Sequence, residues 1–275
     1  MKTIVKLFFE AKLYANTGSG NVWEIFKTLF LLYFKSKFFD TSQKTGAHSI
    51  RSFKVHTYSY SILIHLYRDI FLKQIYKPSL STNTPFIVDC GANIGISVLY
   101  FKYLYPEGEV WAFEPNPHSF YLLEKNIKEN NIIGVKLYNC ALGNMEEQIV
   151  FYVPINKSSL NGGSYISFEK GNIVHVQCQR LSQIVKGKKI DLIKIDIEGD
   201  ETNVIEDLDQ QHTLKYASEY VMEYHFKPTR TSKDFSDFIT LFEKNGFVCE
   251  LNYNEEIEIN KQDILVRAKR RQYLR

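Results

Sequence analysis

The sequence predicts an α/β fold in which a mostly parallel sheet carries helices on both faces and follows a helical N-terminal extension. From Pro85 onward, short apolar runs alternate with stretches of helical periodicity. The first of these runs ends in a glycine-containing turn. The composition, 44% hydrophobic and 24% charged, is that of a globular protein and excludes a disordered or collagen-like chain. Four scattered cysteines, with no C-x-x-C pair, predict reduced thiols in a cytoplasmic protein.

The first 84 residues differ from the rest in charge and in aromatic content. Residues 1–84 hold 12 Lys and Arg against 4 Asp and Glu, a net charge of +8. Residues 85–275 hold 22 against 27, a net charge of −5. The extension also carries 16 of the 40 aromatic residues. We therefore predict two parts, a basic aromatic extension over 1–84 and an acidic domain over 85–275.

Two helices are expected in the extension. Residues 22–39 are the most hydrophobic stretch, but their lysines leave a charge-free run far shorter than the roughly 20 apolar residues of a membrane span. This helix either lies on a membrane surface with its lysines toward anionic lipid, or packs on the domain or on a second subunit. Residues 58–76 form the other helix, and the polar stretch 79–84 is a linker.

The domain is expected to contain seven sheet strands linked mainly by helices. The strands are 86–89, 109–114, 135–140, 190–196, 219–224, 247–252 and 263–268. The helices are 96–104, 118–130, 201–208 and 235–245. Because only about ten residues join the last two strands, these should form an antiparallel pair at one edge. Residues 148–153 and 173–178 break the alternation and predict an inserted β-hairpin, with residues 161–164 between its strands.

A nucleotide pocket is predicted where the first strand gives way to a helix. Gly91 and Gly95 allow a tight turn and a close approach of backbone to ligand. Glu114 ends the second strand, where an acid accepts hydrogen bonds from ribose hydroxyls. Asn93 replaces the middle glycine of the dinucleotide fingerprint G-x-G-x-x-G, which favours a nucleoside ligand without a pyrophosphate, such as S-adenosylmethionine.

Four motifs resemble the FkbM family of S-adenosylmethionine-dependent methyltransferases. They are FIVDCGANIG at 86–95, FEPN at 113–116, CALG at 140–143 and IKIDIEGDE at 193–201. The resemblance covers about residues 85–250. It implies the class I methyltransferase fold, a Rossmann-like sheet of seven strands, and methylation of a hydroxyl, often on a sugar or glycan-like product.

The resemblance also implies the cofactor contacts. Residues that would line the methionine end are Asp89, Gly91, Asn93 and Gly95, with Asp196 beside them. Glu114 would hold the ribose. Cys140 and Ala141 would lie along the adenine, together with Leu142. Asn139 stands near the position where many methyltransferases carry an acid that reads the adenine amine, so the adenine is expected to be held by backbone groups or by Asn139.

The reacting centre is predicted at the ends of the fourth and fifth strands, which meet at one rim. Asp196 and Glu198 follow the fourth strand, and Glu223 and His225 lie at the end of the fifth. A hydroxyl acceptor has to lose its proton, and histidine is the usual base near neutral pH. We assign His225 as the base, with Asp196 and Glu198 as alternatives, and expect the other side chains to orient it and bind substrate hydroxyls. A structural histidine is the competing interpretation.

Several alternatives remain at this point. Asp196, Glu198, Glu223 and His225 include the ligand types of a divalent metal, but their spacing does not demand one, and we assign no metal ligands. A nicotinamide-dependent oxidoreductase would use the same sheet, although no hydride-transfer set is evident. A non-catalytic protein that docks on a membrane or partner would keep the pocket. Nucleic acid is not expected as a partner, because the domain is acidic. The acceptor and the oligomeric state are left open.

Overall fold

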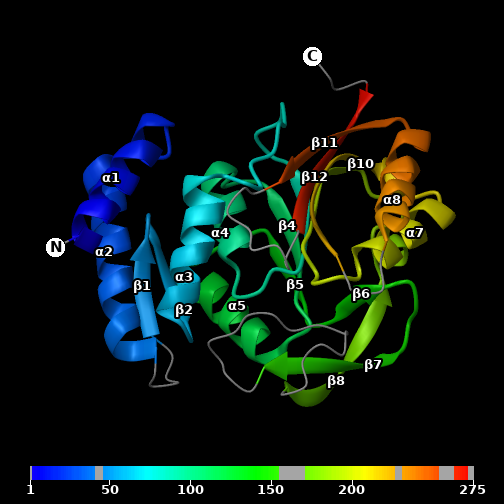
Figure 1. Ribbon diagram of the computed structural model, residues 1–275. Helices are drawn as coiled ribbons and strands as arrows, with labels where there is room; N and C mark the ends of the chain where they lie inside the picture. Colours follow the sequence, from blue (N-terminus) through cyan, green and yellow to red (C-terminus); the bar gives the residue numbers. More distant parts are fainter. Residues whose placement is uncertain (1, 41–45, 155–170, 227–230, 254–262, 272–275) are drawn as a thin grey trace.

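Seven strands form one twisted sheet at the centre of the computed structural model, which describes residues 2–40, 46–154, 171–226, 231–253 and 263–271 (Figure 1). The strand order is β11-β12-β10-β9-β3-β4-β5. The strands are β3 (Phe86–Cys90), β4 (Glu109–Phe113), β5 (Val135–Tyr138), β9 (Ile190–Ile195), β10 (Ala217–His225), β11 (Phe247–Tyr253) and β12 (Asp263–Arg270). The predicted α/β fold with a mostly parallel seven-stranded sheet is confirmed.

The direction of each strand also follows the sequence prediction. Strands β5, β4, β3, β9 and β10 are parallel neighbours. Strand β12 runs antiparallel to both β10 and β11, so the last two strands form the expected antiparallel pair at one edge. The carboxyl ends of β3, β4 and β9 therefore meet at one rim, where ligands bind in open α/β sheets.

Helices cover the two faces of the sheet because its strands are apolar on both sides. They are α4 (Ile96–Leu104), α5 (Pro117–Glu129), α6 (Leu181–Ile184), α7 (Glu201–Gln210) and α8 (Ser232–Lys244). Neighbouring residues of β3 point to opposite faces, so Ile87 joins one core with α4 and α5 and Val88 joins another with α7 and α8. The four helices expected from periodicity are all present, with ends shifted by a few residues.

The strand expected over 135–140 ends earlier than predicted, and a separate short strand that was not predicted follows it. Strand β5 ends at Tyr138, and β6 (Ala141–Gly143) leaves the main sheet to pair in parallel with β8 (Gly171–Arg180). Strand β8 also pairs antiparallel with β7 (Gln148–Pro154), which confirms the inserted hairpin. The predicted turn at 161–164 lies outside the described residues.

The N-terminal extension packs against the sheet side that carries α4 and α5 (Figure 1). It contains α1 (Lys2–Asn16), α2 (Val22–Phe39), β1 (Gly46–Ile50), β2 (Phe53–Thr57), α3 (Tyr60–Leu66) and the π-helix η2 (Tyr67–Leu72). The helix expected over 22–39 is found, and that over 58–76 is replaced by α3 and η2. The hairpin β1–β2 was not predicted. Within the described residues, no helix is both long enough and apolar enough to cross a membrane.

The segment after η2 reaches from the extension to the sheet. Arg267 of β12 donates hydrogen bonds to the carbonyl oxygens of Ile75 (2.5 Å) and Lys77 (2.9 Å). The backbone N–H of Ser79 donates to Glu219 of β10 (2.9 Å). These bonds hold the segment along the sheet, and Tyr76 is buried between them.

Candidate functional site

The turn after β3 is built from residues in left-handed backbone conformations. Gly91 has φ +87° and Gly95 has φ +90°. A Cβ atom added to Gly91 would lie 1.8 Å from the carbonyl oxygen of Asp196, so only glycine fits between the ends of β3 and β9. Asn93, at φ +50°, adopts the same region with a side chain. This turn exposes backbone groups at the rim where the strands end.

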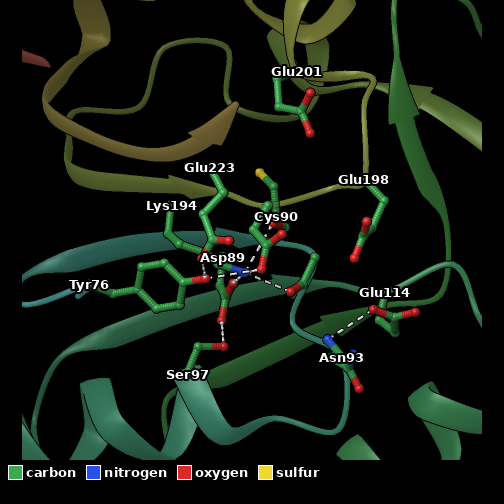
Figure 2. A network of polar contacts seen from close by, with 12 residues as sticks. Tyr76, Asp89, Cys90, Asn93, Ser97, Glu114, Lys194, Glu198, Glu201 and Glu223 are labelled. Atoms are coloured by element: carbon green, nitrogen blue, oxygen red, sulfur yellow. Dashed lines mark hydrogen bonds and ion pairs between the residues drawn. The ribbon is translucent and has the colours of Figure 1, made fainter. Parts of the chain in front are cut away.

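Glu114, directly after β4, faces this turn with both carboxylate oxygens fixed. One oxygen accepts the backbone N–H of Asn116 (2.8 Å) and the other accepts that of Asn93 (2.9 Å) (Figure 2). Burial raises the pKa of Glu114 to about 7, although these two hydrogen bonds lower it. The remaining lone pairs of this oriented carboxylate can accept hydrogen bonds from a ligand.

A pocket that is partly open to solvent lies between the turn, Glu114 and the hairpin. Its lining combines apolar side chains, among them Phe113, Leu142 and Phe151, with the carboxylates of Glu114 and Asp196. Phe151, together with Ile149, comes from β7. The inserted hairpin thus supplies part of the pocket wall.

Six of the nine predicted cofactor residues line this pocket: Gly91, Asn93, Glu114, Cys140, Ala141 and Asp196. The other three stand behind its wall. Asp89 is fully buried and accepts the hydroxyl of Ser97. Gly95 caps α4 and packs on Leu123. Asn139 donates to the carbonyl oxygen of Glu114 (2.7 Å), so it holds the strand end that presents Glu114.

Lys194 links the turn after β3 to the end of β9. Its ammonium lies 3.2 Å from Asp89 and 3.6 Å from Asp196, and it donates to the carbonyl oxygen of Gly91 (2.7 Å). Burial alone would lower its pKa, but these carboxylates raise it instead. Lys194 is therefore charged and fully buried, and it fixes the three groups around it.

Asp196, Glu198 and His225 converge as predicted. The Nε2 atom of His225 lies 3.8 Å from Asp196 and 3.7 Å from Glu198. The opposite ring nitrogen, Nδ1, lies 2.8 Å from the buried carboxylate of Glu201, at the start of α7. Glu198 has φ +58°, so the chain does not stay extended after β9 but turns back toward the imidazole. Glu201 therefore orients the ring so that Nε2 faces the other two carboxylates.

Glu223 belongs to the same network through a residue that the sequence did not indicate. The hydroxyl of Tyr76 lies 3.0 Å from Asp196 and also hydrogen-bonds to Glu223 (Figure 2). Tyr76 comes from the extension, and no motif marks it. Glu201 ends the IKIDIEGDE run, so it could have been noticed, but its contact with His225 depends on the meeting of α7 and β10.

The protonation of these groups is set by burial and by mutual charge. Burial raises the pKa of Glu198 to about 7 and that of Glu223 to about 8. Burial lowers the pKa of His225, but the hydrogen bond to Glu201 and the charges of Asp196 and Glu198 raise it well above its usual value. The imidazole is therefore positively charged near neutral pH, and it stands among carboxylates.

The same three side chains could hold a divalent metal. One ligand atom from each of Asp196, Glu198 and His225 lies within 4.8 Å of the others. Two carboxylates and one imidazole suit ions such as Mn²⁺. The protonated imidazole of His225 already places a positive charge beside Asp196 and Glu198. The carboxylates are therefore compensated without a metal ion.

Comparisons with known proteins identify the family of the chain. The sequence model described as "Methyltransferase FkbM domain" matches residues 89–249. "Methyltransferase 1" of Beauveria bassiana is 30% identical over 203 residues, which cover 66% of this chain and 80% of that protein. "Methyltransferase sdnD" of Sordaria araneosa is 31% identical over 183 residues, which cover 54% and 69%. A crystal structure of M. jannaschii TYW2 in complex with AdoMet is 16% identical, with a TM-score of 0.46, over 82% of this chain and 86% of that one.

Proposed function

The chain belongs to the FkbM methyltransferase family and is an S-adenosylmethionine-dependent methyltransferase, and we propose that its acceptor is a hydroxyl group of a sugar, glycan or related metabolite. The observation that carries this proposal is the position of the Asp196–Glu198–His225 cluster. Asp196 and Glu198 line the same pocket as Glu114. A cluster of hydrogen-bonding and proton-accepting groups beside a nucleoside pocket suits an acceptor rich in hydroxyls.

The pocket residues fit the cofactor in their chemistry. Glu114 would accept hydrogen bonds from the ribose hydroxyls, and the apolar side chains of Phe113, Leu142 and Phe151 would contact the adenine. The Gly91 turn and Asp196 would hold the methionine end. When bound, S-adenosylmethionine supplies an electrophilic methyl group on a positively charged sulfur. The negative charges of Glu114, Asp196 and Glu198 favour such a ligand.

We assign the removal of the acceptor proton to Glu198. His225, favoured on the sequence alone, is held protonated by three carboxylates and cannot accept a second proton there. Glu198 was one of the two alternatives, and its pKa of about 7 is matched to proton transfer near neutral pH. His225 then orients Glu198 and stabilises its charge, while Asp196 positions the acceptor. Correct placement of the hydroxyl supplies much of the rate.

Two measurements test this function in sequence. Calorimetry should detect S-adenosylmethionine binding by the wild type, loss of binding in Glu114→Ala and no binding of NAD⁺. Release of S-adenosylhomocysteine should then be followed with a panel of sugars and glycosides, with amines and carboxylic acids as controls. Methyl transfer to a nitrogen or a carboxylate, but not to a hydroxyl, would reject the proposed acceptor. Binding of NAD⁺ in place of S-adenosylmethionine would favour the oxidoreductase alternative.

A further inference from the structure

The two N-terminal helices leave an apolar surface uncovered. Half of the large apolar side chains exposed in the described part of the chain lie on α1 and α2. Trp23 is 66% exposed, Phe9 63% and Phe38 62%. The buried sides of the same helices, with Leu7 and Leu29, already pack on the core. The exposed aromatic rings are therefore not needed to attach the extension to the domain.

The exposed rings follow helical spacing. On α1, Val5, Phe9 and Leu13 recur every four residues and lie on one side. On α2, Phe34 and Phe38 continue a line that starts at Trp23. The ring of Phe8 on α1 contacts those of Trp23 and Phe26 on α2, which joins the two lines. We call the exposed side chains of both helices, Ile4, Val5, Phe9, Leu13, Trp23, Phe34, Phe38 and Phe39, the aromatic surface.

Positive charge surrounds the aromatic surface. Lys2, Lys6 and Lys12 of α1 and Lys27 and Lys37 of α2 are exposed. The two acidic residues of these helices are neutralised by arginines, since Glu10 pairs with Arg68 (2.5 Å) and Glu24 with Arg51 (3.1 Å). The helix pair thus presents exposed lysines around apolar rings, with its carboxylates compensated.

A basic groove lies beside the aromatic surface, between α2 and the β1–β2 hairpin. Its lining includes Lys27 and Lys35, together with Arg51, which pairs with Glu24, and Lys54, which pairs with Glu129 (2.8 Å). His48 also lines it, and burial together with the charge of Lys35 lowers the pKa of His48 to about 4. The groove side of α2 lies roughly a quarter of a turn from the aromatic line, and Lys27 stands between them.

We propose that the aromatic surface and the basic groove dock the protein on the surface of an anionic phospholipid membrane. Aromatic rings enter the boundary between headgroups and acyl chains, while lysines bind the anionic headgroups around them. A second copy of the chain fits less well, because two positively charged faces would meet. This inference concerns a surface remote from the pocket and is independent of the acceptor that the enzyme methylates.

Trp23 provides a direct reporter of docking. Trp111 is only 8% exposed, and Trp111→Phe leaves Trp23 as the single tryptophan. Full-length protein with this change should show a blue shift of its fluorescence with vesicles of phosphatidylcholine and phosphatidylserine, but not with pure phosphatidylcholine. Binding should weaken as the ionic strength rises.

Matched variants distinguish the effect of lysines at the aromatic surface from the effect of the protein's total charge. Lys6→Gln, Lys12→Gln and Lys27→Gln together should weaken vesicle binding about a hundredfold. Exposed lysines of the domain, changed in Lys128→Gln, Lys186→Gln and Lys233→Gln, should have little effect. Phe9→Asn with Phe38→Asn should abolish the fluorescence shift, whereas Ile133→Asn should not.

Two results would overturn the proposal. One is the absence of vesicle binding at low ionic strength by well-folded protein that still binds S-adenosylmethionine. The other is self-association in analytical ultracentrifugation that Phe9→Asn with Phe38→Asn abolishes, without any vesicle binding, which would assign the surface to a second copy. A wild-type protein that binds vesicles but transfers no methyl group to any hydroxyl acceptor would reject the proposed function and leave the docking proposal intact.

Discussion

The hydroxyl of Tyr76 lies 3.0 Å from the carboxylate of Asp196, although 120 residues separate them in the sequence. The same hydroxyl contacts Glu223, so one proton donor serves two carboxylates. Burial raises the pKa of Glu223 to about 8, so the charge of this carboxylate near neutral pH depends on the hydrogen bonds that it receives. A residue of the extension thereby helps to set the charge of the reacting centre.

Replacing Tyr76 with phenylalanine should impair turnover more than folding. The hydrogen bond from Tyr76 lowers the pKa of Glu223, so its loss should raise that pKa further and shift the acidic limb of the kcat profile to higher pH. We expect kcat to fall about tenfold, the value of a hydrogen bond to a charged group. Tyr220→Phe, which removes a buried hydroxyl bonded to Leu214, is the control. An unchanged pH profile in Tyr76→Phe would remove Tyr76 from this role.

Gly91→Ala should lower the unfolding free energy more than Gly187→Ala does. Gly187 has a similar positive φ of +74°, but a Cβ atom there would meet nothing within 4 Å. Both substitutions incur the backbone strain of about 1–2 kcal/mol, and only Gly91→Ala adds a clash with Asp196. We expect a larger loss of unfolding free energy and a loss of S-adenosylmethionine binding in Gly91→Ala. Equal stability of the two variants would contradict the geometry at Gly91.

The affinity for S-adenosylmethionine should depend on the charge of Glu114. With a pKa of about 7, Glu114 loses its negative charge as the pH falls through neutrality. The part of the affinity that depends on this carboxylate should fall about tenfold between about pH 8 and about pH 6. Glu114→Gln should bind more weakly and lack this part of the pH dependence. Calorimetry at several pH values measures both, and an identical pH dependence in the two proteins would exclude Glu114 as its source.

The unfolding free energy should fall as the pH rises from about 4.5 to about 7, in part because of Glu198. Its pKa is about 7 when folded and 4.5 when unfolded, so the folded chain binds more protons in this window and loses stability as Glu198 ionises. Glu198→Gln should flatten the fall and raise Tm near neutral pH by roughly 5 °C. The exposed Glu146→Gln is the control. A slope unchanged by Glu198→Gln would show that Glu198 does not titrate in this range.

His225→Gln should slow turnover while leaving S-adenosylmethionine affinity almost unchanged. The substitution removes the charge beside Glu198 and Asp196, and a loss of about a hundredfold in kcat is expected for a group that orients the base. Because the protonated imidazole supplies the local positive charge, excess EDTA should leave the rate of the wild type unchanged. A rate abolished by EDTA and restored by Mn²⁺ would instead assign Asp196, Glu198 and His225 as metal ligands.

The sequence predicts the sheet well because its strands are apolar runs between glycine, proline and polar turns. Local patterns of this kind also place Gly91, Glu114 and Asp196 at one rim, since parallel strands end on the same side. They do not reveal Tyr76, whose neighbours Ile75 and Lys77 are held through their carbonyl oxygens by Arg267, nearly 200 residues away. Nor do they give the charge of His225, which depends on Glu201 entering from α7. Strand β6 was missed because its only partner strand among the described residues, β8, lies more than 25 residues further along the chain.

The hydrogen bonds from Arg267 to the backbone on either side of Tyr76 have a consequence for the order in which the site forms during synthesis. Ribosomes make the extension first, yet Tyr76 is held in place by a strand that is made some 190 residues later. The strands β3, β4 and β9, whose ends carry the pocket, are all made before β12. The last part of the reacting centre to be fixed during synthesis should therefore be the contact of Tyr76 with Asp196 and Glu223, because it waits for Arg267.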